Sequence, residues 1–154
     1  MRNAIVAAAV SAVLSSAVWA SDGDMGKFLG SWELDLGRTT AEIKRIAKED
    51  RSQLDTAFGK MTVEDMLAQV KDLAAAMRYQ ITAKEVIGLM NGQKDATPYS
   101  VLSSKETSAV IVVNKGGRSV TNTLSLVDGK YMVESQSRGF VWKKAGEQPT
   151  EARK

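Results

Sequence analysis

The chain has 154 residues without cysteine or histidine, and its 21 basic and 18 acidic side chains leave a net charge of +3. The missing cysteines exclude disulfides and thiolate chemistry, and the missing histidines remove the commonest general base near neutral pH and most zinc ligands. The basic residues are interspersed with acidic ones, so we expect no nucleic-acid partner. We expect neither an enzyme nor a cofactor.

Residues 1–20 have the pattern of a cleaved secretory signal. Arg2 precedes an apolar run that begins at Ala4, and Val18 and Ala20 occupy the positions where a signal peptidase needs small side chains. The apolar run is too short for a membrane-spanning helix of about 20 residues, so we expect no integral membrane segment after cleavage. The sequence predicts export to the periplasm, with secretion as the alternative. It also predicts one domain and a disordered tail, over residues 21–145 and 146–154.

The segment GSWELDL, residues 30–36, predicts one isolated strand near the start of this domain. Its alternation of apolar and polar residues turns Trp32, Leu34 and Leu36 toward the same side. The next strand pattern begins about forty residues later. The partners of this early strand must therefore come from distant parts of the chain.

A helical insertion is predicted between this strand and the next, over residues 39–77. The first helix begins at a capping box formed by Thr39 and Glu42, and a glycine ends it. The second helix begins at Thr62, with Asp65 in the matching position. Apolar residues recur at the three- and four-residue spacing of a helix in both segments, which indicates that each buries one face.

From Met77 onward the period changes to two, and turn signals recur about every ten residues. This pattern predicts an antiparallel meander. The strongest hairpin signals are Asn91-Gly92 and Asp128-Gly129. Seven strands are predicted, near residues 77–82, 85–90, 99–102, 108–113, 120–126, 130–135 and 139–144.

A seven-stranded meander would leave two exposed edges, which favour aggregation. The early strand can lie between these edges and close the sheet. The predicted fold is therefore mainly β, an eight-stranded antiparallel up-and-down barrel or near-closed barrel with two helices inserted between strands 1 and 2. The alternative is an open antiparallel α+β sheet with the helices on one face, because strands 85–90 and 108–113 are apolar on both sides.

Gly30-Ser31-Trp32 matches a G-x-W signature on a first strand, and a meander follows it. In these features the chain resembles the calycin superfamily, which includes the lipocalins and the fatty-acid-binding proteins. The resemblance implies that Gly30 and Trp32 close one end of the barrel. It also implies that a basic residue near the last strand packs on the tryptophan, for which Arg138 and Lys143 are the candidates. The helix pair resembles the helices over the barrel mouth of fatty-acid-binding proteins.

The interior of an eight-stranded barrel is just wide enough to be filled by side chains or to hold one small ligand. Aromatic side chains with polar tips suit a ligand cavity, and they also suit an ordinary core. An empty void of roughly 300 Å³ would cost about 7 kcal/mol, so any cavity should be small, occupied or hydrated. The candidate ligand-binding residues are Trp32, Phe58, Tyr79, Met90, Tyr99, Asn122, Tyr131 and Trp142.

Two functions follow as hypotheses. The first is a periplasmic, non-enzymatic, lipocalin-like protein that binds a small apolar or amphipathic ligand, such as a lipid, inside the barrel. The alternative is a protein-binding module, for instance an inhibitor of an envelope or secreted enzyme, that contacts its partner through hairpin loops at residues 91–98, 115–118 and 137–138. No metal site is expected, because the calcium-loop-like stretch at 22–27 has Lys27 where that loop needs glycine.

Overall fold

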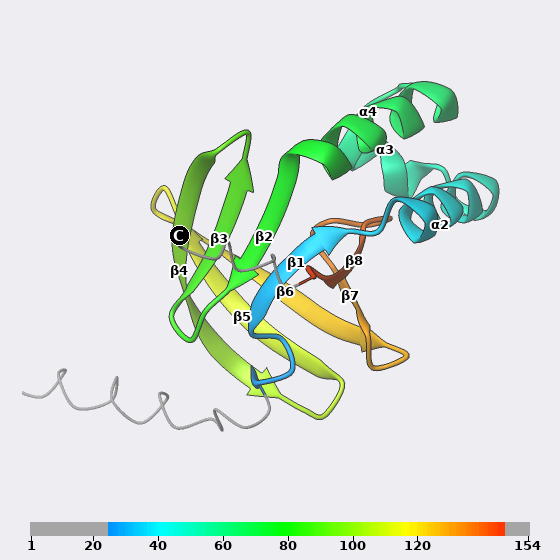
Figure 1. The fold of residues 1–154 in the computed structure, drawn as a ribbon. Helices are drawn as coiled ribbons and strands as arrows, with labels where there is room; N and C mark the ends of the chain where they lie inside the picture. Colours follow the sequence, from blue (N-terminus) through cyan, green and yellow to red (C-terminus); the bar gives the residue numbers. More distant parts are fainter. Residues whose placement is uncertain (1–24, 147–154) are drawn as a thin grey trace, which may run out of the picture.

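A computed structural model describes residues 25–146. Eight antiparallel strands form a closed barrel in which each strand pairs with the next in the chain and the last returns to the first (Figure 1). The predicted up-and-down barrel is confirmed, and the open-sheet alternative is wrong. The predicted signal peptide and the tail beyond residue 146 lie outside the described residues. The strands are β1 Gly30–Leu34, β2 Met77–Ile81, β3 Glu85–Met90, β4 Gln93–Ser104, β5 Ser108–Lys115, β6 Arg118–Val127, β7 Tyr131–Glu134 and β8 Val141–Lys144.

Strand β1 closes the barrel by pairing with both β2 and β8. Trp32 lies opposite Tyr79 on one side and Lys144 on the other. Leu34 lies opposite Trp142. The early strand therefore occupies the predicted position between the two ends of the meander, and closure leaves no free sheet edge.

The hairpin turns have the backbone that their sequences predict. Asn91 and Gly92 have φ values of 49° and 79°, and Asp128 and Gly129 have 53° and 66°. Positive φ at both central residues defines the mirror-image turn that matches strand twist. Strand β4 is longer than its predicted range, 99–102, because its first half pairs with β3 and its second half with β5.

Three helices, rather than the predicted two, join β1 to β2. They are α2 Leu36–Glu49, α3 Ser52–Phe58 and α4 Val63–Ala76. Helix α2 ends at Asp50, whose carboxylate accepts hydrogen bonds from the backbone and hydroxyl of Ser52, the first residue of α3. The predicted start of α4 is confirmed, because Thr62 Oγ1 accepts from the Asp65 backbone N–H at 3.1 Å. None of the helices within residues 25–146 is long and apolar enough to span a membrane.

Helix α2 begins three residues before its predicted start at Thr39. Asp35 is its N-cap, and the Asp35 carboxylate accepts from the backbone N–H of Arg38 at 2.9 Å. Leu36, predicted to face inward from a strand, therefore begins the helix and is 38% exposed. Thr39 is instead fully buried against β8, where its hydroxyl accepts from Val141 N at 3.0 Å and donates to Val141 O at 3.3 Å.

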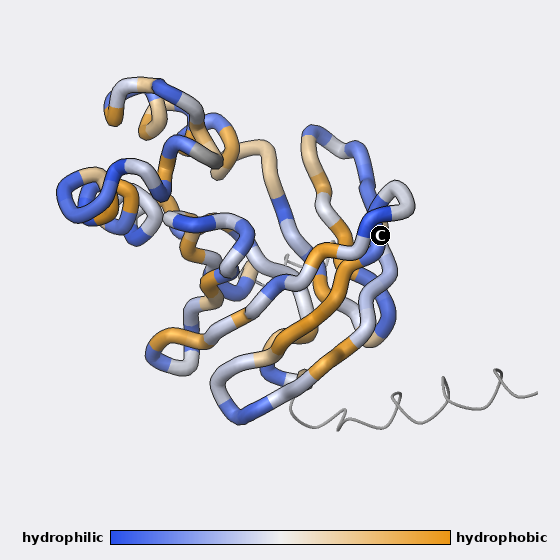
Figure 2. The backbone as a smooth tube through the Cα atoms, turned by 180° about the vertical axis from the view of Figure 1, so that it is seen from behind, coloured by the Kyte–Doolittle hydropathy of each residue, from blue (hydrophilic) through white to orange (hydrophobic). Residues whose placement is uncertain are grey.

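The two ends of the barrel differ. At the closed end, where β1 begins, Met25 and Phe28 are buried in the core. At the helical end, where β1 ends and β2 begins, the helices contact β1, β2 and β8. The hydrophobic segments of the chain lie mainly within the strands, and the turns are mainly hydrophilic (Figure 2). One hydrophobic cluster runs from the closed end through the barrel to the buried faces of the helices.

Candidate functional site

Aromatic side chains around Trp32 seal the closed end of the barrel. Trp32 and Phe28 are almost completely buried, and Trp32 Nε1 donates to the Phe28 carbonyl at 2.8 Å. The Lys144 ammonium lies 4.1 Å from the centre of the Trp32 ring and donates to the carbonyl of Leu29. Gly30 is required beside it, because a Cβ there would lie 3.2 Å from Lys144 Nζ and its φ is +118°.

Lys144 is thus the basic residue on Trp32, and the predictions of Arg138 and Lys143 for this position are wrong. Alternation along β8 places Lys143 on the outside of the barrel, where its Nζ lies 3.4 Å from Glu33 Oε1. Arg138 precedes β8 at the opposite end of the barrel and donates to Gln53 Oε1 at 2.9 Å. The resemblance to the calycin superfamily predicted a basic residue on Trp32. It did not predict which residue of the last strand faces inward.

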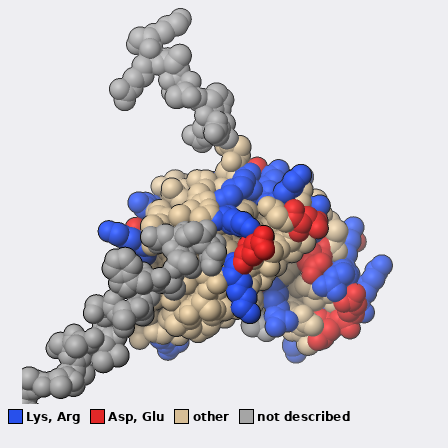
Figure 3. All heavy atoms as spheres, turned by 90° about the horizontal axis from the view of Figure 1, so that it is seen from below, with Lys and Arg blue, Asp and Glu red and all other residues tan. Residues whose placement is uncertain are grey.

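A cleft of about 370 Å³ lies beside this seal, outside the barrel interior. Lysine side chains dominate its walls. The face seen from below carries a band of basic side chains across the middle of the molecule, with acidic side chains beside it (Figure 3). The lining residues are Lys27, Trp32, Gly129, Lys130, Tyr131, Lys143 and Lys144.

A polar cluster lies inside the barrel, between β2, β6, β7 and β8. Alternation with the buried Met132 turns Glu134 inward, and Asn122 Nδ2 donates to Glu134 Oε2 at 2.7 Å. The Tyr79 hydroxyl is close enough to this carboxyl to influence its pKa, and the Tyr79 ring stacks on Trp142 with ring centroids 5.3 Å apart. We call Tyr79, Asn122, Glu134 and Trp142 the interior cluster. It contains three of the predicted ligand-binding residues.

The surroundings of the interior cluster favour the uncharged form of its acid. Burial raises the pKa of the Glu134 carboxyl, and the hydrogen bond from Asn122 and the nearby Tyr79 hydroxyl offset this only in part. Burial also raises the pKa of Tyr79, and the neighbouring Glu134 charge adds to that rise. The Trp142 indole N–H slightly lowers the pKa of the Glu134 carboxyl. It forms no hydrogen bond with any of the described residues. The cluster therefore contains a buried donor without a partner.

At the helical end, on the side away from the helices, the inward-facing side chains are partly exposed. Met77, Tyr79, Tyr99 and Val113 face the interior by register but are only partly buried. At the rim, Met90 and Val120 also belong to the inward-facing rows and are both 41% exposed. Met90 is therefore a rim residue rather than the deep interior residue that alternation alone predicts.

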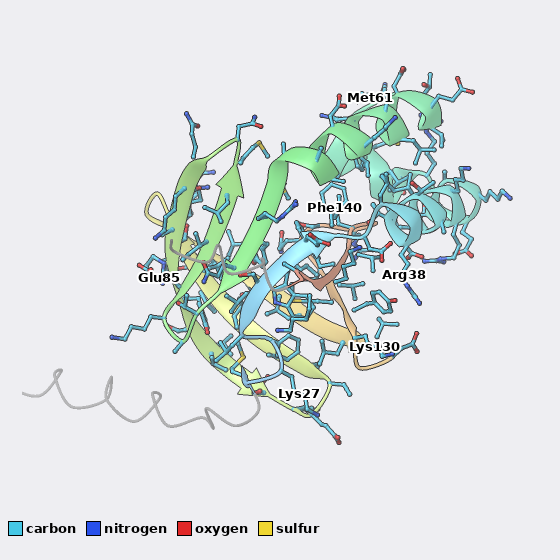
Figure 4. The ribbon with its side chains drawn as sticks, viewed as in Figure 1. Lys27, Arg38, Met61, Glu85, Lys130 and Phe140 are labelled. Carbon is cyan, nitrogen blue, oxygen red and sulfur yellow. The ribbon has the colours of Figure 1, made fainter. Side chains whose placement is uncertain are left out.

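Phe58 connects the helices to the interior cluster. Its ring makes an edge contact with Phe140, at 5.8 Å between centroids, and Phe140 makes another with Trp142 at 6.3 Å. Phe140 lies between the helices and the barrel (Figure 4). The predicted residue Tyr99 faces the interior and donates its hydroxyl to the Thr82 carbonyl at 2.7 Å.

The prediction that Tyr131 faces the interior is wrong. Met132 and Glu134 occupy the inward positions of β7, so Tyr131 lies on the outer face, with the Arg38 guanidinium 3.7 Å from its ring centroid. It borders an outer cleft of about 650 Å³ between α2 and strands β6 and β7. Arginine, aromatic, aliphatic and acidic residues line this cleft, among them Arg38, Arg45, Val133, Arg138, Phe140, Glu42 and Glu134.

The residue of the interior cluster that the sequence did not predict is Glu134. The segment YMVE, residues 131–134, contains the signal, because a buried Met132 requires Glu134 on the same side of the strand. A single acid near a strand end is usually at the surface, so the pattern favoured an exposed position.

No group of three or more acidic side chains within residues 25–146 is arranged to hold a metal ion. The interior cluster combines hydrogen-bonding groups, aromatic faces and one carboxyl. Comparisons of the chain with models of protein families, with curated proteins and with solved structures found no match.

Proposed function

We propose that the protein is a non-enzymatic, periplasmic binding protein that holds one small amphipathic molecule inside its barrel. The observation that carries this proposal is the interior cluster, a set of polar groups among aromatic rings, in a barrel whose inward-facing side chains are buried at one end and partly exposed at the other. Pockets for small molecules combine apolar walls with a few convergent polar groups. The signal-like first twenty residues support the location.

The cost of the interior cluster favours a ligand over a purely structural role. A buried carboxyl without a charged partner lowers stability relative to an apolar side chain of similar size. The inward-facing rings of Tyr79 and Tyr99 are also left partly exposed, so their apolar surface is not fully removed from water. A bound molecule would bury these rings and complete the hydrogen bonds of the cluster, including that of the Trp142 N–H.

Native mass spectrometry of protein purified gently from its own cells tests the proposal. We expect the wild-type chain to retain a small molecule. Tyr79→Ala should lose it because a ring of the site is removed, and Tyr131→Ala should keep it because this ring lies outside the barrel. The proposal fails if the wild type carries no ligand, or if Tyr131→Ala loses the ligand as readily as Tyr79→Ala. Co-purification of an envelope protein with an empty barrel would instead support the inhibitor hypothesis.

A further inference from the structure

We infer that the ligand is a small organic cation, an amine or quaternary ammonium compound with an apolar part, bound between the Glu134 carboxylate and the faces of aromatic rings in the barrel. The inference rests on the proposed function and specifies the class of its ligand.

The first observation is that the buried acid Glu134 has no basic partner among the described residues. Glu134 is the only buried charged residue among residues 25–146, and no ion pair within that range includes it. Its side-chain hydrogen bond comes from the neutral amide of Asn122, and the neighbouring Tyr79 hydroxyl is neutral as well. Because a buried charge without a countercharge costs several kcal/mol, the empty barrel favours the protonated acid. An organic cation would supply the missing countercharge.

The second observation is the arrangement of rings around this acid. Tyr79 stacks on Trp142 at an interplanar angle of 28°, and Phe140 makes an edge contact with Trp142. Tyr99 is near enough to influence the Tyr79 hydroxyl. Aromatic faces attract ammonium groups through their negative quadrupole, and proteins that recognise quaternary ammonium compounds use such rings. An ionised Glu134 would also offer the buried Trp142 N–H a charged acceptor.

The charges elsewhere on the inward face argue against an anionic ligand. Lys144 is held at the closed end by Trp32 and Leu29. At the opposite rim Lys115 pairs with Asp95, and Arg118 is exposed. Lys144, Lys115, Asp95 and Arg118 are not among the groups that shift the pKa of Glu134. A carboxylate or phosphate group at the interior cluster would therefore meet an acid without a buried basic partner.

A cation that binds the ionised acid must displace its proton. We therefore expect affinity to rise with pH until Glu134 is ionised in the free protein, and binding to release a proton in the lower part of that range. The other titratable groups acting at the cluster are Tyr79 and Tyr99. Burial raises the pKa of Tyr79 further above its ordinary value of 10.0, so Glu134 is the group expected to produce the pH dependence.

Isothermal titration with three probes of equal chain length tests the inference: decyltrimethylammonium, decanol and decanoate. We expect decyltrimethylammonium to bind at least about tenfold more tightly than the other two. In buffers of different ionisation enthalpy, its binding heat should reveal proton release. Glu134→Gln should remove most of this preference and the proton release, because the amide side chain does not ionise. Glu33→Gln makes the same change at a partly buried, outward-facing position, and should behave as the wild type.

The outcomes separate the inference from the proposed function. If decanol or decanoate binds as tightly as decyltrimethylammonium and competes with it, the inference is overturned and the proposed function stands. If no probe binds and the native protein carries no ligand, the proposed function fails as well. Should Glu134→Gln not fold, the wild-type pH profile decides: an affinity for decyltrimethylammonium that does not rise with pH overturns the inference.

Discussion

Lys144 packs on Trp32 across the β1–β8 seam, with its ammonium 4.1 Å from the ring centroid and hydrogen-bonded to the carbonyl of Leu29. The two side chains come from the first and last strands, so their contact joins the ends of the sheet at the sealed mouth. Burial lowers the pKa of Lys144, as expected for an ammonium partly removed from water. The contact combines a charge interaction with the packing of a long aliphatic stem.

Removing this contact should weaken the closed end. We expect Lys144→Ala to lower the free energy of unfolding by about 1 kcal/mol, because it removes a cation–π contact and the packing of the lysine stem. Urea denaturation followed by tryptophan fluorescence measures the change. Lys143→Ala is the matched control, since its ion pair with Glu33 is on the outer face and should contribute under about 0.5 kcal/mol. Equal losses in both variants would contradict the assigned role of Lys144.

Glu134 should make stability depend on pH. Its folded-state pKa is raised above the ordinary value of 4.5, so the folded chain retains a proton that the unfolded chain has already lost. The free energy of unfolding should therefore fall as pH rises from about 4.5 to the folded-state pKa, by up to about 1.4 kcal/mol per pH unit.

Glu134→Gln should remove this part of the pH profile, so that the variant gains stability relative to the wild type as pH rises. Thermal melts between acidic and neutral pH measure the effect, and Glu33→Gln controls for the loss of one negative charge. A constant difference between Glu134→Gln and the wild type across this range would show that Glu134 is not the titrating group.

Thr39 should be important for docking the helices. Thr39→Val retains the size of the side chain but leaves the buried Val141 N–H without its partner. The expected loss of stability is about 1–3 kcal/mol. Thr40→Val makes the same change next to it on a partly exposed position and should alter stability by under about 0.5 kcal/mol. The two variants can be compared by chemical denaturation, and indistinguishable midpoints would count against the docking role.

Gly139 should not tolerate a larger side chain. Its φ is +90°, and a Cβ would lie 3.1 Å from Ile43 Cγ1 and 3.6 Å from Leu54 Cδ2. We expect Gly139→Ala to cost about 2–4 kcal/mol, since backbone strain and crowding against the helices add. Gly116→Ala shares the positive φ but meets open space, so it should cost about 1 kcal/mol. Differential scanning calorimetry of both variants separates the cost of backbone strain from the cost of crowding against the helices. Similar melting temperatures for the two variants would show that crowding does not contribute.

The strand number and the closure of the barrel were predictable because their signals are local and repeated. Period-two alternation marks each strand, and Asn91-Gly92 and Asp128-Gly129 mark two of the turns. The break between α2 and α3 was less visible. Asp50 ends α2 and accepts a hydrogen bond from the Ser52 hydroxyl at the start of α3, within a segment whose apolar spacing continues from one helix to the next.

The candidate site was only partly predictable. Tyr79, Asn122 and Trp142 were found because aromatic and amide side chains alternate with polar positions, whereas Glu134 resembles a surface acid. Tyr131 was assigned to the wrong face because β7 has only four residues, and in so short a strand a one-residue error in phase inverts every side chain.

Barrel closure also has a kinetic consequence. The β1–β8 seam joins segments at nearly opposite ends of the described chain, and Ala145 N still donates to Ser31 O beyond it at 2.9 Å. Contacts of such high sequence separation form slowly, because a long loop must lose entropy before they are made. Before β8 pairs with β1 the meander would have two unpaired edges, so its inner face would be accessible from the side.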